Sequence, residues 1–157
     1  MYVAVVGAGV DATEAQCALA EEVGALLAEA GVTVVTGGLG GVMEAASRGA
    51  RSRHGTTVGL LPGLDRSAAN GWVEVSIPTG LGELRNGLVV RASDAVVAVG
   101  GGPGTLSEIA LALKGGLVVI GLGTWEVPGV HAASSAQDAV AHALAAARGH
   151  LGGTGPA

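Results

Sequence analysis

The sequence is poor in aromatic side chains and in cysteine. It contains no phenylalanine, one tyrosine and two tryptophans among 157 residues, whereas glycine occurs 29 times. The core is therefore expected to pack through small and β-branched side chains. The lone cysteine, Cys17, cannot form an internal disulfide, and its place in an Ala- and Leu-rich helical stretch favours a buried structural thiol.

Long apolar runs and a positive charge balance are also missing. No run approaches the roughly 20 apolar residues that a membrane span requires, so no membrane partner is expected. The chain passes from Met1 into an apolar stretch without a basic leader, which disfavours a secretory signal and favours a cytoplasmic location.

The formal net charge of −5 disfavours duplex nucleic acid as a partner. One predicted helix carries a basic cluster that we expect to be a solvated face. It comprises Arg48, Arg51, Arg53 and His54.

Strand-like and helix-like segments alternate along the chain. This alternation is typical of parallel βαβ units, and the continuously apolar strands are expected where helices cover both faces of a sheet. The sequence therefore predicts an α/β fold: one doubly wound, mostly parallel, Rossmann-like nucleotide-binding domain over residues 1–148. The predicted strands are 2–6, 32–36, 56–61, 73–77, 94–99 and 117–121, and the predicted helices are 13–30, 42–53, 81–92, 105–114 and 135–148.

Local signals mark the ends of the first helix, an edge of the sheet and the tail. Thr13 and Gln16 have the spacing of a capping box, and Gly31 is a candidate left-handed residue after the helix. Residues 73–77 alternate between apolar and polar, so we place this strand near an edge. Residues 149–157 are rich in glycine and are predicted to form a disordered C-terminal tail.

Three of the predicted strands run directly into glycine-rich turns, at residues 7–10, 37–41 and 100–105. Ligands of open parallel sheets bind outside the carboxyl ends of the strands, so these turns should converge on one site. Each turn precedes a helix, whose N-terminal N–H groups favour a phosphate. We expect the phosphate within residues 101–105, where Thr105 is either a helix N-cap or a phosphate donor. The predicted phosphate- or nucleotide-binding residues are Gly7, Gly9, Gly37, Gly38, Gly41, Met43, Gly101, Gly102, Gly104 and Thr105.

Two common nucleotide-binding patterns fit less well. Residues 7–12 match the dinucleotide pattern G-x-G-x-x-A. That pattern also requires an acidic residue at the end of the second strand, where this chain has Thr36 followed by Gly37 and Gly38. A P-loop is absent because the only lysine is Lys114, so ATP hydrolysis is not expected.

The segments 36–38, 41–45 and 101–108 resemble the Lonely Guy family and its molybdenum-cofactor carrier relatives. Lonely Guy enzymes are cytokinin riboside 5′-monophosphate phosphoribohydrolases with a P-G-G-x-G-T-x-x-E motif. Residues 100–108 match this motif except that glycine stands where proline is usual. Those enzymes also carry an arginine before a Ser-Asp pair, and Arg85 precedes Asp94 with the same spacing. The resemblance implies that Arg85 and Glu108 fill the two catalytic positions.

The resemblance to the molybdenum-cofactor carriers covers more of the chain, roughly residues 2–125, and is closer. In that group a pterin cofactor with a phosphate is held but not transformed. Three positions depart from the Lonely Guy pattern and weaken the enzyme interpretation. Gly100 replaces proline, Asn86 replaces the usual lysine after the arginine, and Glu44 replaces a glycine after Met43.

The two candidate catalytic residues each have a functional and a structural interpretation. Cleavage of a base from ribose 5-phosphate requires a carboxylate and an anchor for the phosphate. Glu108 lies one helical turn beyond Thr105, where it can reach a ribose, or it merely complements the positive helix N-terminus. Arg85 clamps a phosphate or ribose hydroxyl with its planar fork, or it pairs with Glu83 or another surface acid.

Two functional hypotheses follow from these residues. The first is a Lonely Guy-type hydrolase that cleaves the N-glycosidic bond of a nucleoside 5′-monophosphate and requires no cofactor. The alternative is a non-catalytic carrier or storage protein with the molybdenum cofactor as cargo. In both, the partner is a small nucleotide or pterin, and a homo-oligomer, a dimer or tetramer, is expected because helices 42–53 and 81–92 mix apolar and charged residues. The histidines lack metal-ligand spacing, so no metal site is predicted. They are His54, His131, His142 and His150.

Overall fold

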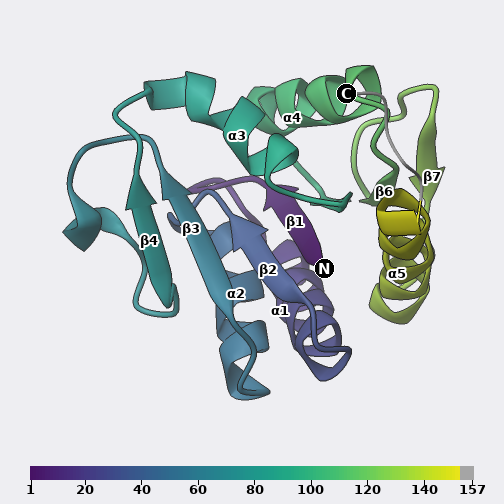
Figure 1. Cartoon of the computed structure of the whole chain (residues 1–157), viewed down its shortest axis with the longest axis horizontal. Helices are drawn as coiled ribbons and strands as arrows, with labels where there is room; N and C mark the ends of the chain where they lie inside the picture. The colour runs from purple at the N-terminus through teal and green to yellow at the C-terminus, as the bar shows by residue number, and fades with distance from the viewer. Residues whose placement is uncertain (153–157) are drawn as a thin grey trace.

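A single parallel sheet forms the centre of the computed structural model, which describes residues 1–152 (Figure 1). Its strand order is β4-β3-β2-β1-β5-β6-β7, and each of the six neighbouring pairs is parallel. The predicted doubly wound α/β fold is therefore confirmed. The strands are β1 (Tyr2–Gly7), β2 (Thr33–Thr36), β3 (Thr57–Leu61), β4 (Val75–Pro78), β5 (Ala95–Val99), β6 (Val119–Leu122) and β7 (Val130–Ala132). The helices are α1 (Glu14–Glu29), α2 (Val42–Ser52), α3 (Asn86–Arg91), α4 (Pro103–Lys114) and α5 (Ala136–Gly152), with 3₁₀ turns η1 (Arg66–Ala68) and η2 (Gly82–Arg85).

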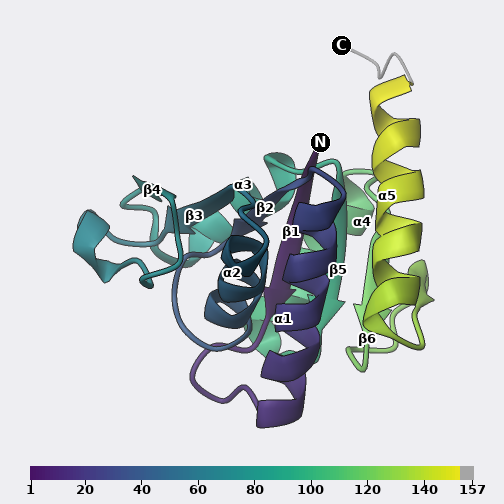
Figure 2. The same cartoon turned by 90° about the horizontal axis from the view of Figure 1, so that it is seen from below.

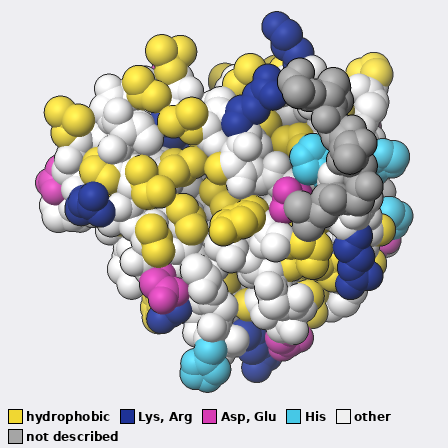
Figure 3. All heavy atoms as spheres, viewed as in Figure 1, with side chains coloured by type: hydrophobic (Ala, Val, Ile, Leu, Met, Phe, Trp, Pro, Cys, Tyr) yellow, Lys and Arg dark blue, Asp and Glu magenta, His cyan; other side chains and the backbone are white. Residues whose placement is uncertain are grey.

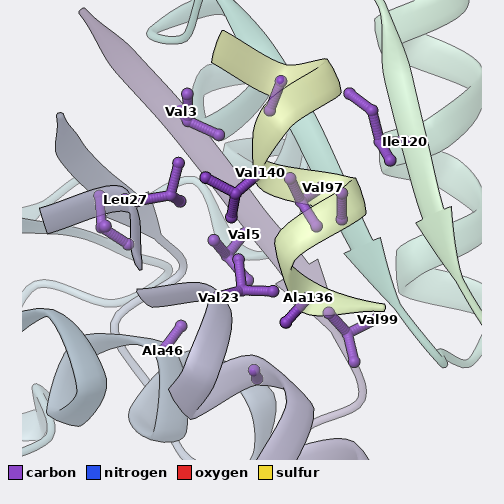
Figure 4. Packing of buried hydrophobic residues seen from close by; sticks show 14 of the residues in the cluster. Val3, Val5, Val23, Leu27, Ala46, Val97, Val99, Ile120, Ala136 and Val140 are labelled. Carbon is purple, nitrogen blue, oxygen red and sulfur yellow. The ribbon is translucent and has the colours of Figure 1, made fainter. Parts of the chain in front are cut away.

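Helices cover both faces of the sheet. Alternate residues of β1 point to opposite sides: Val3 and Val5 pack with α1, α2 and α5 (Figures 2 and 4), whereas Ala4 and Val6 pack with α3 and α4. Because every position of a central strand is buried on one face or the other, the strand is continuously apolar. Small side chains such as Ala46 and Ala136 let the helices approach closely, which compensates for the scarcity of aromatic residues.

The first helix begins and ends as its sequence predicts. The Thr13 hydroxyl accepts a hydrogen bond from the Gln16 amide at 3.2 Å, and the Gln16 side chain accepts one from the Thr13 amide at 3.0 Å. This reciprocal capping box satisfies two N–H groups that would otherwise lack partners. After the helix, Gly31 adopts a φ of 73°, the left-handed conformation that glycine tolerates best.

Helices α1 and α2 pack through two glycines. A side chain at Gly24 of α1 would collide with the backbone carbonyl of Ala46 in α2, and one at Gly49 of α2 would collide with the carbonyl of Glu21 in α1. Each glycine thus makes room for the backbone of the other helix. The two helices form one closely packed pair on the same face of the sheet (Figure 2).

Several predicted boundaries required correction. The segment 81–92 is not one α-helix: it consists of η2 followed by α3. The positive φ of Gly82, 55°, is incompatible with an α-helix that starts at residue 81. The short strand β7 lacks the length and alternation that would have predicted it. Its three residues pair with β6 beyond a left-handed Gly129. Strand β4 lies at an edge, as its alternation predicts.

The last helix is longer than predicted. We expected a disordered tail from residue 149, but α5 continues to Gly152. Ala-rich sequence before Arg148 favours continued helix, and a single glycine at position 149 weakens a helix by about 1 kcal/mol without ending it. The rest of the predicted tail, residues 153–157, lies outside the described residues.

The basic cluster on α2 is paired with carboxylates. Its arginines form exposed ion pairs, so the interpretation as a solvated helix face agrees with the structure. The pairs are Arg48–Glu21 at 2.7 Å, Arg51–Glu74 at 2.7 Å and Arg53–Glu29 at 2.9 Å. Within residues 1–152, no helix combines the length and apolar character needed to cross a bilayer.

Candidate functional site

A cavity of about 310 Å³ opens where the order of the strands reverses. The chain winds outward from β1 through β2 and β3 to β4, and then returns to place β5 on the other side of β1. The turns after β1 and β5 diverge at this point, which creates the crevice where open α/β sheets bind ligands. The cavity is lined by Gly7, Ala8, Gly9, Asp11, Gln16, Met43, Arg85, Asn86, Gly101, Gly102, Pro103, Gly104, Thr105 and Glu108.

The structure brings most of the predicted site residues together. Two of the three glycine turns, those after β1 and β5, meet at the cavity. The lining contains nine of the predicted positions: Gly7, Gly9, Met43, Arg85, Gly101, Gly102, Gly104, Thr105 and Glu108. The turn after β2 contributes none of its predicted glycines to the lining, which leaves out Gly37, Gly38 and Gly41.

The turn after β5 leads into an open helix N-terminus. Gly100 and Gly101 have φ values of 55° and 128°, which side chains rarely adopt, so glycine is required at both positions. Helix α4 starts at Pro103, with Gly102 as its N-cap and no side-chain capping hydrogen bond. Proline suits this position because its missing N–H would have lacked a partner. The N-terminal amides thus remain available to an anion at the cavity.

Thr105 is not the N-cap of α4, which was one of the two roles expected for it. It lies in the first turn of α4 and is buried, because the helix starts two residues earlier than predicted. The turn before it packs against its side chain: a Cβ atom at Gly101 would lie 2.5 Å from Cβ of Thr105. Its other interpretation, as a donor to a phosphate, remains a prediction.

The turn after β2 has a structural explanation for each of its predicted glycines. A side chain at Gly37 would collide with the guanidinium of Arg85, and one at Gly41 would collide with the carbonyl of Gly9. Gly38 has a φ of 76°, and a Cβ atom there would lie 2.8 Å from Cδ2 of Leu61. Gly37 and Gly41 therefore give clearance to residues of the cavity wall, and none of the three glycines lines the cavity itself.

Arg85 is a buried cation at the cavity. It ends η2, only 7% of its surface is exposed, and its Nε is buried without a hydrogen-bond partner among the described residues. Burial lowers the pKa of Arg85, and the nearby Glu108 carboxylate partly opposes that change. The alternative role, an ion pair with Glu83, does not occur within residues 1–152. An anion bound beside an unpaired buried guanidinium would strongly stabilise its charge.

Glu108 lies on α4 and is also only 7% exposed. Burial raises its pKa to about 7, although the charge of Arg85 acts in the opposite direction. Within the described part of the chain, these two side chains form no ion pair within 4.0 Å. Glu108 is therefore a carboxyl that changes protonation near neutral pH inside the cavity.

Five lining residues were not predicted as site residues. Gln16 was identified only as part of the capping box, yet its amide nitrogen lies where a side chain at Gly100 would be. Asn86 follows Arg85, and its amide donates to the Ser107 hydroxyl at 3.4 Å. Ala8 and Asp11 belong to the first glycine turn, and Pro103 belongs to the third, so their turns were a signal that could have found them.

Metal ligation has no support from the geometry of the described residues. Among residues 1–152, no group of three or more His, Cys, Asp or Glu side chains is placed to hold a metal ion. The polar residues of the cavity are instead one arginine, two carboxylic acids, two side-chain amides and one threonine, together with the amides of a helix N-terminus. This set suits a small anionic ligand with additional hydrogen-bonding groups.

Two solved structures and one further protein resemble this chain over most of its length. The molybdenum cofactor binding protein of the phototrophic bacterium Rippkaea orientalis is 37% identical, with a TM-score of 0.88 over 92% of this chain and 95% of that one. The molybdenum cofactor carrier protein of Chlamydomonas reinhardtii is also 37% identical, with a TM-score of 0.82 over 92% and 98% of the two chains. An uncharacterized protein of Archaeoglobus fulgidus is 42% identical over 137 residues, which is 82% of this chain and 89% of that protein.

These similarities confirm the superfamily that the glycine motifs predict. They extend over nearly the whole length of each solved structure, so they concern complete domains and not one shared motif. The model of the SLOG cluster4 family matches residues 1–148. The chain therefore belongs to the SLOG cluster4 family.

Proposed function

We propose that the chain is a non-catalytic carrier of the molybdenum cofactor, a phosphorylated pterin, which it holds at the cavity between β1 and β5. The observation that carries this proposal is the buried Arg85, whose Nε has no partner among the described residues, beside the uncapped N-terminus of α4. A phosphate would supply acceptors to both groups. Two proteins with 37% identity, named as binding or carrying this cofactor, support the same ligand.

The carrier function agrees with the departures from the Lonely Guy pattern. The hydrolase motif expects a lysine after the arginine, whereas Asn86 offers the cavity a neutral amide. Arg85 is then the one basic side chain of the cavity wall among the described residues. A single buried cation and a helix N-terminus suffice to hold a phosphate, but they leave fewer groups to stabilise charge in a transition state.

A hydrolase is the second candidate, and one observation favours it. Glu108 has a pKa of about 7 and lies in the cavity with Arg85. A carboxyl that titrates near the working pH is suited to general acid–base catalysis. In this alternative, Glu108 would act at the ribose of a nucleoside 5′-monophosphate and Arg85 would anchor its phosphate.

The two candidates are separated by comparing Glu108→Gln and Arg85→Ala with the wild type. Each protein would be titrated anaerobically with molybdenum cofactor, separated from free ligand by gel filtration and assayed for oxidised pterin fluorescence. Each would also be incubated with AMP and isopentenyladenosine monophosphate and assayed for free base. A carrier retains the cofactor, releases no base and tolerates Glu108→Gln, whereas Arg85→Ala weakens retention.

The result that contradicts the carrier proposal is equally specific. Release of base by the wild type, with a loss of about 100-fold or more in Glu108→Gln, would establish a hydrolase instead. Either candidate requires no additional cofactor, because molybdenum would enter only as part of the cargo.

We also propose that the chain forms a homo-oligomer. The arginines of α2 are paired within the chain, whereas the opposite face of the sheet exposes large apolar side chains over β4, η2, α3 and α4 (Figure 3). An apolar area of this kind is typical of subunit contacts. It contains Val75, Ile77, Leu81, Leu84, Leu88 and Leu111. Light scattering at micromolar concentration should give a dimer or tetramer, and a monomer would contradict this proposal.

A further inference from the structure

A second, larger cavity of about 580 Å³ lies beside the anion site. It occupies the carboxyl end of β6 and the loop that leads to β7, a part of the chain that the proposed function does not use. The residues that line it include Trp125, Glu126, Val127 and Pro128. Aromatic and apolar walls with one polar group are typical of sites that hold a flat organic ring.

The two cavities are neighbours at the same edge of the sheet. A smaller cavity between them has Gln16 and Gly101 in common with the anion site, and it has Thr124 and Trp125 in common with the second cavity. The three hollows therefore adjoin one another at the carboxyl ends of β1, β5 and β6.

Trp125 is fixed directly to the turn that forms the anion site. Its indole N–H donates to the carbonyl of Gly102 at 3.3 Å, and the hydroxyl of the preceding Thr124 donates to the carbonyl of Gly100 at 2.5 Å. The indole is nevertheless 42% exposed. A ring that is held in place yet open to solvent loses little conformational entropy when a second ring stacks on it.

We propose that the Trp125 cavity holds the planar heterocycle of the ligand whose phosphate lies on the turn at residues 101–105. This inference rests on the proposed anion site and adds the class of ligand. Trp125 supplies a stacking surface, and Glu126 accepts hydrogen bonds from ring N–H groups. A carboxylate matches a ring edge that carries an N–H beside an amino group, as in guanine and pterin, better than adenine, which places an acceptor nitrogen beside its amino group.

The fluorescence of Trp125 itself can report ligand binding at this cavity. The chain has two tryptophans, so Trp72→Phe leaves Trp125 as the single indole. Ribose 5-phosphate, AMP and GMP would be titrated into this variant by fluorescence and calorimetry. We expect GMP to quench Trp125 and to bind at least ten-fold more tightly than ribose 5-phosphate, because its base stacks on the aromatic side chain. AMP should lie between the two.

Two further variants test whether Trp125 and Glu126 account for the tighter binding of GMP. Trp125→Leu should remove the advantage of GMP over ribose 5-phosphate, and Glu126→Gln should remove the preference for GMP over AMP. Trp72→Leu is the matched control, because Trp72 lies near the opposite edge of the sheet and should leave all three affinities unchanged. Should Trp125→Leu fail to fold, the quenching in Trp72→Phe still decides the question.

The outcomes separate this inference from the proposed function. If GMP and ribose 5-phosphate bind equally and Trp125 is not quenched, the ring site is wrong and the anion site stands. If no ligand binds, both are wrong. If GMP binds but ribose 5-phosphate does not, the ring site stands and the proposed anion site is wrong.

Discussion

The turn at residues 37–41 and the turn at residues 100–104 look alike in the sequence. Each contains four glycines, follows a buried strand and leads into a helix. In the structure only the second turn lines the cavity, while the first packs behind it. The glycines of the first turn avoid collisions with Arg85 and with the backbone of Gly9.

The difference between the turns shows that glycine content alone does not identify a phosphate site. A glycine that clears space for a neighbouring backbone and a glycine that exposes its own amide have the same sequence signature. They differ in what a side chain would meet. At Gly41 it would meet a carbonyl, whereas at Gly102 it would meet open space. This contrast leads to four predictions.

The largest effect is expected for Gly41→Ala, which should lower the free energy of unfolding by about 3 kcal/mol. Its φ of 67° is strained for alanine, and the new Cβ would collide with the Gly9 carbonyl. Urea denaturation followed by circular dichroism measures the loss. Gly40→Ala is the matched control from the same turn, because its Cβ would only just reach Glu44 and the change should stay below about 1 kcal/mol. An equal loss of unfolding free energy in both variants would contradict the predicted difference between Gly41 and Gly40.

The second effect concerns ligand affinity. Arg85→Ala should weaken binding of ribose 5-phosphate by ~1.5–3 kcal/mol, because it removes a charge-assisted contact. Gly37→Ala should weaken binding in the same direction by displacing the guanidinium. Calorimetry measures both affinities. Unchanged affinity in Gly37→Ala, with the protein folded, would show that this turn does not act through Arg85.

The third effect concerns the helix that follows the turn at residues 100–104. Because the pKa of Glu108 is raised to about 7, the folded state holds a proton that the unfolded state releases at lower pH. The associated stabilisation is present in acid and is lost as the pH rises through 7. Relative to Glu108→Gln, the wild type should lose roughly 2 kcal/mol of unfolding free energy between about pH 5.5 and about pH 8. Parallel pH profiles of the two proteins would show that Glu108 titrates normally.

The smallest effect on stability is expected for Gly102→Ala. The backbone is extended there, with φ −109° and ψ −163°, and an added Cβ would have no neighbour within 4 Å. The free energy of unfolding should change by less than about 0.5 kcal/mol, while phosphate affinity should fall because the methyl group enters the cavity mouth. A stability loss comparable to that of Gly41→Ala would contradict the contrast between the turns.

Local patterns were sufficient to predict most of the fold. The capping box of Thr13 and Gln16 and the left-handed Gly31 depend on neighbours in the chain, and the structure has both. Strand β7 and the start of α4 at Pro103 were missed. The three-residue β7 is stabilised by pairing with β6, which no local pattern reveals.

The site was predictable only as far as the turns themselves. Gly7 and Gly101 line the cavity because they lie at the carboxyl ends of neighbouring parallel strands: Gly7 ends β1, and Gly101 follows β5. The sequence could not show that Gly37 would face Arg85, which comes from a turn 48 positions later in the chain. It also could not show that Trp125 would reach the turn after β5.

The glycine-mediated contact between α1 and α2 also determines which part of the cavity wall can move. Each helix follows one of the turns at residues 7–10 and 37–41, so the close packing of the helices also links the two turns. Helix α4, which carries Thr105 and Glu108, belongs to the layer on the opposite face of the sheet. We therefore expect ligand entry and release to involve small displacements of the α4 side against a stationary wall, and hydrogen exchange to be slowest across α1 and α2.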